Sequence, residues 1–398
     1  MILELKIKNF LSFKEEAIFS FEATRDKSFE DYQVVEVAPN TRILRLTLVY
    51  GANASGKSNL IKAFELLQHF WLNKPESRDE LTGVCPFLLD RETPQKPSEF
   101  SLIFYVEGTR YLYSLALTEK KVISEKLFVY PGTQPALIFD RKLNDEGLSE
   151  IVFSPKRIKV SQAARDEITI KCLANMSVLA AYNQVNVAIP EVEKVVRWIK
   201  SQHKSLPVGV ADDTESLIAA DKAAKDFMLN FLQLADYNIT AINTGQANEP
   251  TARSAKTEFE HRVVNSEGNE EFYKLMKEHQ SEGTLRTLGL AEAIRKTAEA
   301  NAFLAIDEIE ALLHPRLVEL VIEYFFKQKG QSQLLLTTHY DGLLEEDDLL
   351  RKDSIWFTNK KENGSTELYS LADFKGVNRI SSLQKAYRHG RFGAVPNI

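Results

Sequence analysis

The stretch that decides the fold is Gly51-Ala-Asn-Ala-Ser-Gly-Lys-Ser58, which follows the pattern G-x-x-x-x-G-K-S. In a loop with this pattern, the backbone N–H groups point inward and cradle the phosphates of a nucleotide. Lys57 is expected to reach the β- and γ-phosphates, and the Ser58 hydroxyl is expected to ligate Mg²⁺. The other residues predicted to contact the nucleotide are Asn53, Ser55, Gly56 and Asn59.

The flanking sequence predicts a strand before this loop and a helix after it. Residues 43–50 form an apolar run typical of a buried strand, and residues 59–72 carry apolar side chains at helical spacing. The N-terminus of such a helix adds partial positive charge where the phosphates would lie. This order of elements favours a phosphate-binding loop over a Gly-rich turn that matches the pattern by chance.

Net charge, the length of apolar runs and the cysteines limit the classes of protein to which the chain could belong. The chain has 398 residues and a net charge of −6, which argues against a globally basic nucleic-acid binder but leaves a local basic face open. No apolar run approaches the roughly 20 residues of a membrane span, so we expect no membrane segment. Cys85 and Cys172 lack metal-ligand spacing, and a reducing cytoplasm is therefore the expected location.

The sequence predicts three regions. Residues 1–150 would form an N-terminal lobe with the phosphate loop and an antiparallel β subdomain, residues 151–235 a helical insertion, and residues 236–398 a C-terminal lobe. Because helices and strands alternate after residue 281, we expect a parallel sheet with crossover helices. The first and last regions are therefore expected to form one α/β core.

Apolar periodicity predicts the individual elements of these regions. Residues 131–150 are polar and rich in turn formers, and residues 243–250 predict a loop. The expected strands are 3–7, 43–50, an antiparallel set over 99–130, 237–242, 257–264, 272–277, 302–306 and 332–337, and the expected late helices are 285–300 and 315–328.

A second motif, Asn301-Ala-Phe-Leu-Ala-Ile-Asp307-Glu308, predicts a buried strand that ends in two acids. Asp307 would hold Mg²⁺, which proteins usually bind through one or two carboxylates plus phosphate oxygens. Glu308 would accept a proton from the attacking water. Taken alone, an acidic turn after a core strand is the simpler interpretation, but the upstream loop favours the catalytic one.

Two weaker motifs follow the same logic. His339 comes directly after a predicted core strand and is expected to sense the γ-phosphate, although a lone His is more often a polar loop residue. Ser281-Glu-Gly283-Thr284 opens a helix, for which Ser281 is a suitable N-cap. In the alternative interpretation, the Ser281 hydroxyl and the Gly283 N–H contact the γ-phosphate of a nucleotide held by a second subunit.

Together these motifs resemble the ABC-type ATPases of the RecF, Rad50 and SMC kind. The segment Asp307-Glu-Ile-Glu-Ala-Leu-Leu-His-Pro315 is more similar to OLD-like and abortive-infection AAA-family ATPases such as RloA and AbiLii. The tail Tyr387-Arg-His-Gly-Arg-Phe-Gly-Ala-Val-Pro396 is similar to the C-terminal ending of that group, with a tail that makes no contacts as the alternative. Two features depart from these families: we find no long heptad run like those of SMC and Rad50 proteins, and we expect no Toprim nuclease domain like that of OLD nucleases after His339.

The resemblance implies an α/β P-loop NTPase of the ABC-ATPase head type, with a mixed sheet core, an antiparallel β subdomain and a helical insertion. It implies ATP and Mg²⁺ as cofactors, with Lys57, Glu308 and His339 as the catalytic residues. ATP would lie between two copies, in a homodimer or a higher assembly built from dimers. The implied role is the ATPase or sensor subunit of a bacterial anti-phage system that controls a separate effector, such as a nuclease.

Two alternatives stay open at this point. The first is a RecF-like DNA-repair ATPase, which would bind nucleic acid in a salt-sensitive way. The second is a scaffold that binds ATP and a partner protein, with incidental hydrolysis.

Overall fold

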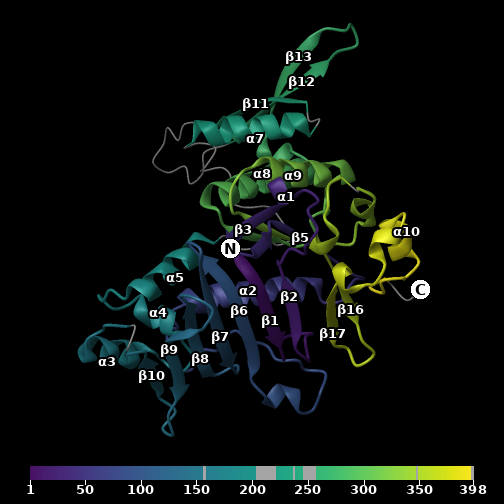
Figure 1. Ribbon diagram of the computed structural model, residues 1–398. Coiled ribbons are helices and arrows are strands. Elements are labelled where there is room, and N and C mark those ends of the chain that lie inside the picture. Colours follow the sequence, from purple (N-terminus) through teal and green to yellow (C-terminus); the bar gives the residue numbers. More distant parts are fainter. Residues whose placement is uncertain (156–157, 203–220, 236–237, 245–256, 347, 396–398) are drawn as a thin grey trace. The chain divides into compact units, whose positions relative to one another are not determined.

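The computed structural model describes residues 1–155, 158–202, 221–235, 238–244, 257–346 and 348–395 (Figure 1). The chain divides into two units. The core unit comprises Met1–Ser205, Ala300–Asp307 and Gln331–Ile398. The hairpin unit comprises Leu206–Glu299 and Glu308–Gly330.

A five-stranded sheet of the core unit contains the strand that precedes the phosphate loop. The first four strands in the order below are mutually parallel, and the last is antiparallel to its neighbour. Three of the parallel strands are wholly buried, as expected for a sheet covered on both faces. The predicted parallel sheet built from both ends of the chain is therefore confirmed. The order is β14 (Phe303–Ile306), β15 (Gln333–Thr338), β5 (Leu46–Tyr50), β16 (Ile355–Lys360) and β17 (Thr366–Ser370).

A seven-stranded antiparallel sheet forms the second layer of the core unit. It confirms the antiparallel set predicted over 99–130, and it continues into residues 131–150, which the sequence indicated to be polar and rich in turns and which contain β9 and the start of β10. The two strands occupy half of that stretch, and β9 carries the buried residues Ile138, Phe139 and Arg141 among its polar ones. The order is β10 (Ser149–Phe153), β9 (Ala136–Leu143), β8 (Val122–Tyr130), β7 (Thr109–Leu117), β6 (Ser98–Val106), β1 (Ile2–Lys8) and β2 (Ala17–Ser20).

The prediction of one strand over 43–50 was wrong, because two strands share this apolar run. β4 (Thr41–Leu44) pairs with β3 (Val34–Ala38) in a small separate sheet that follows α1 (Glu30–Gln33), and β5 begins after Arg45. The Arg45 side chain is buried and donates to the Tyr32 carbonyl at 3.0 Å and to Ser332 Oγ at 3.2 Å. The chain changes sheets at this point because these partners hold the guanidinium inside.

The helix α2 (Lys57–Leu72) lies against the five-stranded and the seven-stranded sheets of the core unit (Figure 1). Phe64 packs on Phe303 of β14, with ring centroids 4.8 Å apart, and Trp71 packs edge-on against Tyr113 of β7 at 5.4 Å. The helix predicted over 59–72 is confirmed and begins two residues earlier. Its packing fixes the end of the phosphate loop relative to β5.

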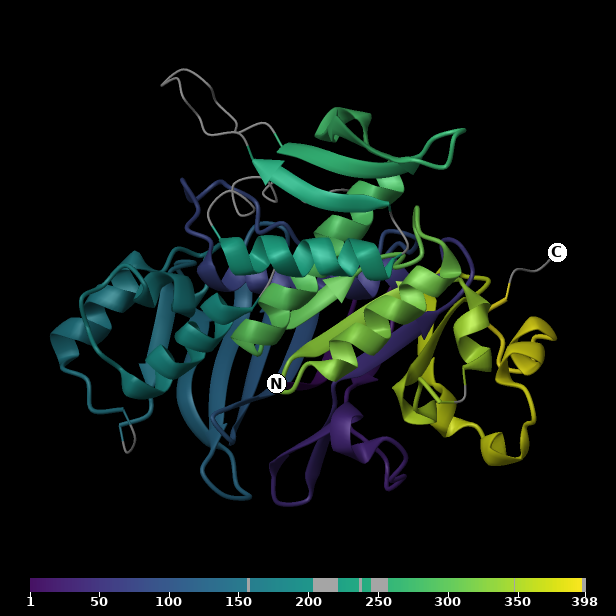
Figure 2. The same ribbon diagram turned by 90° about the horizontal axis from the view of Figure 1, so that it is seen from above.

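Three helices cover one face of the seven-stranded sheet: α3 (Gln162–Lys171), α4 (Val178–Tyr182) and α5 (Pro190–Ser201). Figure 2 shows them beside the antiparallel strands. On α5, Trp198 stacks on Phe104 of β6 with ring centroids 4.3 Å apart. This part of the predicted helical pattern is confirmed by the buried stripe Val192, Val195, Val196 and Ile199.

A buried carboxylate ties these helices to the sheet. Glu125 of β8 is fully buried, and its Oε1 accepts from Tyr113 Oη at 2.9 Å and from Ser177 Oγ at 2.7 Å. Its Oε2 accepts from the Val178 N–H, which begins α4, at 2.9 Å. Burial raises the pKa of Glu125, and the positive charge of Arg141 opposes that rise.

We expect Glu125→Ala to lower the free energy of unfolding by about 3–5 kcal/mol, because it leaves the buried donors of Tyr113, Ser177 and Val178 without their acceptor and removes the negative charge near Arg141. Urea unfolding followed by circular dichroism would measure this. Glu150→Ala, at an exposed position of β10, is the control and should change the free energy by less than about 0.5 kcal/mol. Equal stability of Glu125→Ala and the wild type would show that the cluster does not hold α4.

In its described residues, the hairpin unit combines a small antiparallel sheet with the helices α7, α8 and α9. Its predicted strands are confirmed within three residues at each end. The loop predicted over 243–250 was wrong at Asn243 and Thr244, which belong to β11, and residues 245–250 lie outside the described part of the chain. Its core contains Met228, Leu232, Ile242, Phe259 and Leu288. The elements are α7 (Lys222–Leu234), β11 (Ile239–Thr244), β12 (Thr257–Val264), β13 (Glu270–Met276), α8 (Glu282–Ala300) and α9 (Pro315–Lys327).

Candidate nucleotide-binding site

The phosphate loop connects β5 to α2, as its sequence predicts. Two residues have left-handed backbone conformations, Ala54 with φ 60° and Gly56 with φ 111°. The Lys57 side chain is buried, and its Nζ donates to the carbonyls of Gly51 at 2.8 Å and Ala52 at 3.1 Å. The ammonium group is therefore held within the loop, where it could neutralise a phosphate.

Hydroxyl groups from neighbouring strands brace this loop. Ser55 Oγ bonds to Thr358 Oγ1 of β16 at 2.7 Å, and Thr366 Oγ1 of β17 donates to the Ser55 carbonyl at 2.8 Å. Asn59 Nδ2 donates to Ser12 Oγ at 2.7 Å. The side chains of Ser55 and Asn59 thus support the loop, whereas Asn53 is exposed at its tip. The bracing residues were missed at the sequence level, where the only signal was a hydroxyl within an apolar run, as at Thr358.

We expect Gly56→Ala to weaken nucleotide binding by at least about tenfold and to destabilise the core unit by about 1–3 kcal/mol. Gly56 has a backbone conformation that L residues rarely adopt, and an added Cβ would collide with the Thr366 hydroxyl. Titration with a fluorescent ATP analogue and thermal unfolding would measure the two effects. Gly132→Ala is the matched control, because no atom lies within 4 Å of its added Cβ.

Three parts of the predicted site come together at one edge of the five-stranded sheet. Ile306 pairs with Leu336, and Thr338 pairs with Tyr50, so the carboxyl ends of β14, β15 and β5 lie side by side. Asp307, the exposed His339 and the phosphate loop follow these three ends directly. In open α/β sheets, ligands bind outside the carboxyl ends of the strands, which is where these groups lie.

The donor set at this edge fits Mg²⁺. Asp307 Oδ1 accepts a hydrogen bond from Thr337 Oγ1 at 2.5 Å, which orients the carboxylate. Ser58, at the start of α2, adds a half-buried hydroxyl. Both are hard oxygen ligands of the kind that Mg²⁺ prefers. Thr337 was also missed at the sequence level, although it is the first polar residue after the apolar run Leu334-Leu-Leu336 of β15.

The remaining predicted residues, Ser281, Gly283 and Glu308, belong to the hairpin unit. Ser281 is the N-cap expected for α8, because its Oγ accepts from the Thr284 N–H at 3.0 Å. The Gly283 carbonyl accepts from Thr287 Oγ1 at 2.8 Å. Glu308 has a positive φ of 45°, and the Ala311 N–H donates to its carbonyl at 2.9 Å. The contact of Ser281 and Gly283 with nucleotide stays a prediction.

The C-terminal tail packs beside the strands that carry the site. It contains α10 (Leu383–Arg388), and its Tyr387 packs against Tyr50 at the end of β5, with ring centroids 5.8 Å apart. Phe392 stacks on Phe357 of β16 at 5.5 Å, and Tyr369 Oη donates to the Phe392 carbonyl at 2.7 Å. The alternative of a tail without contacts was therefore wrong for the described residues, up to Val395.

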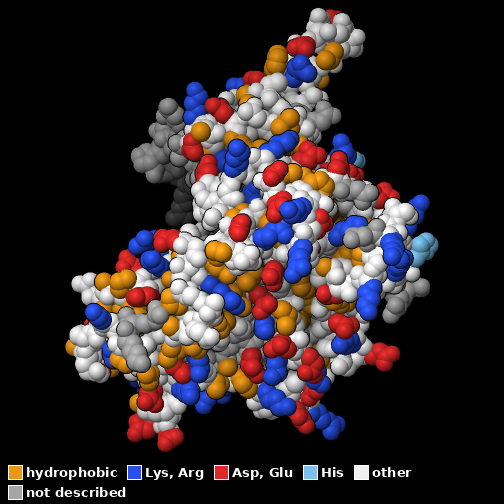
Figure 3. Space-filling model, viewed as in Figure 1, with side chains coloured by type: hydrophobic (Ala, Val, Ile, Leu, Met, Phe, Trp, Pro, Cys, Tyr) orange, Lys and Arg blue, Asp and Glu red, His pale blue; other side chains and the backbone are white. Residues whose placement is uncertain are grey.

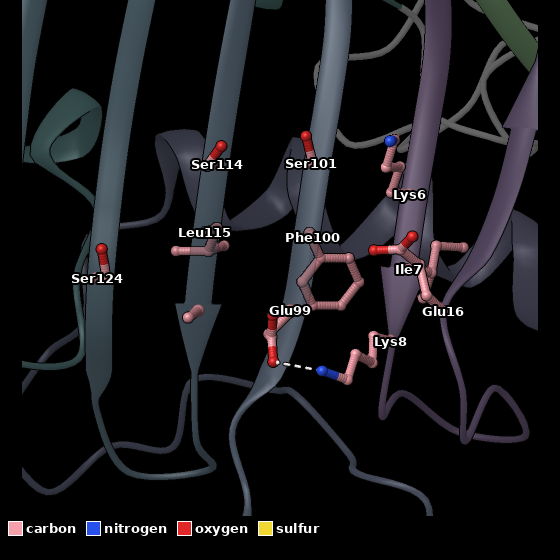
Figure 4. A pocket seen from close by; sticks show the side chains of 11 residues that line it. Lys6, Ile7, Lys8, Glu16, Glu99, Phe100, Ser101, Ser114, Leu115 and Ser124 are labelled. Carbon is pink, nitrogen blue, oxygen red and sulfur yellow. Dashed lines mark hydrogen bonds and ion pairs between the residues drawn. The ribbon is translucent and has the colours of Figure 1, made fainter. Parts of the chain in front are cut away.

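A shallow hollow of about 180 Å³ lies elsewhere in the core unit, over β1, β6 and β7 (Figure 4). Its lining includes Lys6, Ser101 and Ser114, and it shares no residue with the phosphate loop. Lys8 and Glu99 form an ion pair of 3.2 Å at its rim, so their charges largely cancel. This pair therefore gives the hollow no net charge that would attract a ligand, and we assign no ligand to the hollow.

Comparison with known proteins gives one family match. The family model described as "AAA domain, putative AbiEii toxin, Type IV TA system" matches residues 46–345. No curated protein matches the sequence. In the described residues, no helix combines the length and apolar character that a membrane crossing requires.

Several solved structures are similar to the chain at low sequence identity. The SMC head domain from Thermotoga maritima is 13% identical, with 93% of this chain and 98% of that chain covered and a TM-score of 0.45. An SMC head bound to the C-terminal winged-helix domain of ScpA is 15% identical, with 97% and 99% covered and a TM-score of 0.47. An SMC head with an extended coiled coil, bound to a ScpA domain derived from Pyrococcus furiosus, is 12% identical, with 98% and 99% covered and a TM-score of 0.45.

Proposed function

This chain belongs to the AAA-domain family whose model spans its residues 46–345, and we propose that it is a Mg²⁺-dependent ATPase. The observation that carries the proposal is the meeting of the phosphate loop, Asp307 and His339 at one edge of the parallel sheet. The α/β fold agrees with the predicted class, a P-loop NTPase of the ABC-ATPase head type with a mixed sheet and an antiparallel β subdomain.

In the proposed reaction, the chain acts mainly by positioning charge around the γ-phosphoryl group. The backbone of the loop and Lys57 would hold the phosphates, and Ser58 and Asp307 would hold Mg²⁺. The metal, when bound, would neutralise charge on the phosphate oxygens. Glu308 would accept the proton of the attacking water, and His339 would contact the γ-phosphate.

The proposal places ATP between two copies of the chain. Ser281 and Gly283 of one copy would complete the site formed by the phosphate loop of the other. This is supported by the exposed position of Ser281 at the N-terminus of the 19-residue helix α8, where backbone N–H groups favour an anion. Loss of the γ-phosphate contacts would loosen such a dimer, so the ATP state would act as a conformational switch.

We extend this proposal to a cytoplasmic sensor subunit of an anti-phage system that controls a separate effector protein. The family description, which mentions the AbiEii toxin, supports this role over DNA repair. The net charge of −6 points the same way. We propose that both ends of the chain supply the ATPase core. The predicted regions 151–235 and 236–398 are each divided between the core unit and the hairpin unit, so their bounds do not coincide with the two units.

The test is ATP turnover with and without the Lys57 ammonium group. Wild-type protein with Mg²⁺ should release phosphate, and Lys57→Ala should lower the rate by about 10²-fold, because a preorganised positive charge is lost from the site. Lys74→Ala, just past the end of α2 and exposed, is the matched control and should leave the rate unchanged. Absence of turnover in the wild type, or an unaffected Lys57→Ala, would refute the proposal.

A further inference from the structure

The hairpin formed by β12 and β13 exposes apolar side chains at its outer end. β11 pairs with Thr257–His261 of β12, so the hairpin continues beyond β11 as two strands (Figure 1). Figure 3 shows hydrophobic side chains on its surface, interspersed with charged ones. A protruding apolar cluster of this kind marks an interaction surface. Its members, between 38% and 61% exposed, are Val263, Val264, Phe272, Tyr273 and Leu275.

The strand β13 forms an edge of the three-stranded sheet. Among the described residues, β12 is the strand that pairs with it. Next to the turn, the Asn265 N–H donates to the Asn269 carbonyl, and hydrogen-bonded pairs recur at every second residue of an antiparallel ladder. The odd-numbered residues of β13 therefore direct their backbone groups toward β12. The even-numbered ones, Glu270, Phe272 and Lys274, direct theirs toward the open edge.

Edge strands are usually protected against pairing by Pro, by bulges or by charges. β13 contains no Pro, and its pairing with β12 runs from Glu270 to Met276 without a register shift. Lys274 is exposed and would disfavour pairing with any strand that offers no opposite charge. The edge of β13 could therefore pair with another strand, provided that this strand places a negative charge opposite Lys274.

We propose that β13 pairs antiparallel with β13 of a second copy of this chain, about a two-fold axis at Phe272. In this register Phe272 lies opposite the partner's Phe272, and Glu270 lies opposite the partner's Lys274. By symmetry, Lys274 lies opposite the partner's Glu270, so two Glu–Lys pairs form. Each residue in these pairs directs its backbone N–H and C=O outward, as a hydrogen-bonded antiparallel pair requires.

Charge selects this register over its neighbours. Centring the axis on Glu270 or on Lys274 would place like charges opposite one another, which destabilises a sheet. Centring it on Tyr273 would place Lys274 opposite the partner's Phe272 and leave both charges without a cross-strand partner. Within its own hairpin Glu270 also lies 3.3 Å from Arg262, and both groups are half exposed, so this pair stays accessible to the partner's Lys274.

The interface needs no nucleotide and contains no residue of the proposed ATP site. It would exist whether or not the chain hydrolyses ATP. If ATP also holds two copies together, the two different two-fold contacts would join dimers into larger assemblies.

Sedimentation velocity without nucleotide tests the proposal. The wild type should dimerise in a concentration-dependent way, and Lys57→Ala should dimerise equally, which separates this test from that of ATPase activity. Glu270→Lys and Lys274→Glu should each weaken dimerisation by about tenfold or more, because each replaces two attractive pairs with two repulsive ones. The double variant Glu270→Lys/Lys274→Glu should restore it.

Glu278→Lys makes the same charge change at an exposed position just past β13 and should leave dimerisation unchanged. Circular dichroism would verify that each variant is folded. A monomeric wild type, a folded double variant that fails to recover, or a Glu278→Lys variant as weak as Glu270→Lys would each overturn the proposal.

Discussion

Glu308→Gln should lower the rate of ATP hydrolysis by about 10²–10⁴-fold while leaving ATP binding intact, since a general base contributes about that much to a proton transfer. Glutamine has the shape of glutamate but accepts no proton from water at neutral pH. The phosphate loop and Asp307 are untouched by the change, so ATP and Mg²⁺ should still bind. Single-turnover phosphate release and equilibrium nucleotide titration would separate the two effects.

The same variant should accumulate as an ATP-bound dimer, because the γ-phosphate contacts are made but not broken. Glu345→Gln, at an exposed position of the loop after β15, is the control and should hydrolyse ATP at the wild-type rate. A Glu308→Gln protein with undiminished turnover would exclude this carboxylate as the base.

Mixing two inactive variants should restore activity if ATP is sandwiched between copies. Ser281→Asp keeps an N-cap for α8, because Asp caps as well as Ser, but it would place a carboxylate against the γ-phosphate. Lys57→Ala damages the phosphate loop instead. A mixed dimer would keep one intact site, so a 1:1 mixture should recover about a quarter of wild-type turnover by statistical pairing of identical interfaces.

A mixture of Lys57→Ala with Gly56→Ala is the control for this experiment. Both changes lie in the phosphate loop, so no mixed dimer can contain an undamaged loop beside an intact Ser281, and no activity should return. If Ser281→Asp alone is fully active, or if its mixture with Lys57→Ala stays inactive although mixed dimers form, the shared site is refuted.

Local patterns were sufficient for much of the fold. The phosphate loop with the helix after it, the buried strand before Asp307 and the helix after Ser281 were all predicted at the right places. Each depends on neighbouring residues only: apolar period, a capping hydroxyl, or a Gly that permits a left-handed turn. Such signals can be read without knowing what packs against the element.

The sequence-based predictions failed where a strand boundary, a strand pairing or a side-chain contact depended on residues far away in the chain. The run 43–50 splits because Arg45 finds buried acceptors in Tyr32 and Ser332. β9 forms because β8 pairs with it along its length, and β10 forms because it pairs in turn with β9. Thr337, which orients Asp307, acts across two strands, so its role had no local signature.

The sequence by itself determined that this chain has a phosphate-binding loop, two acids after a buried strand and a capped helix, because each is written in consecutive residues. Only the tertiary structure decided that β14, β15 and β5 end at one edge, and that β13 pairs with β12 and with no other strand of the described residues. Strand order and strand pairing depend on contacts between residues far apart in the chain. The alternation of polar and apolar side chains shows which face of a strand is buried, but not which other strand it pairs with.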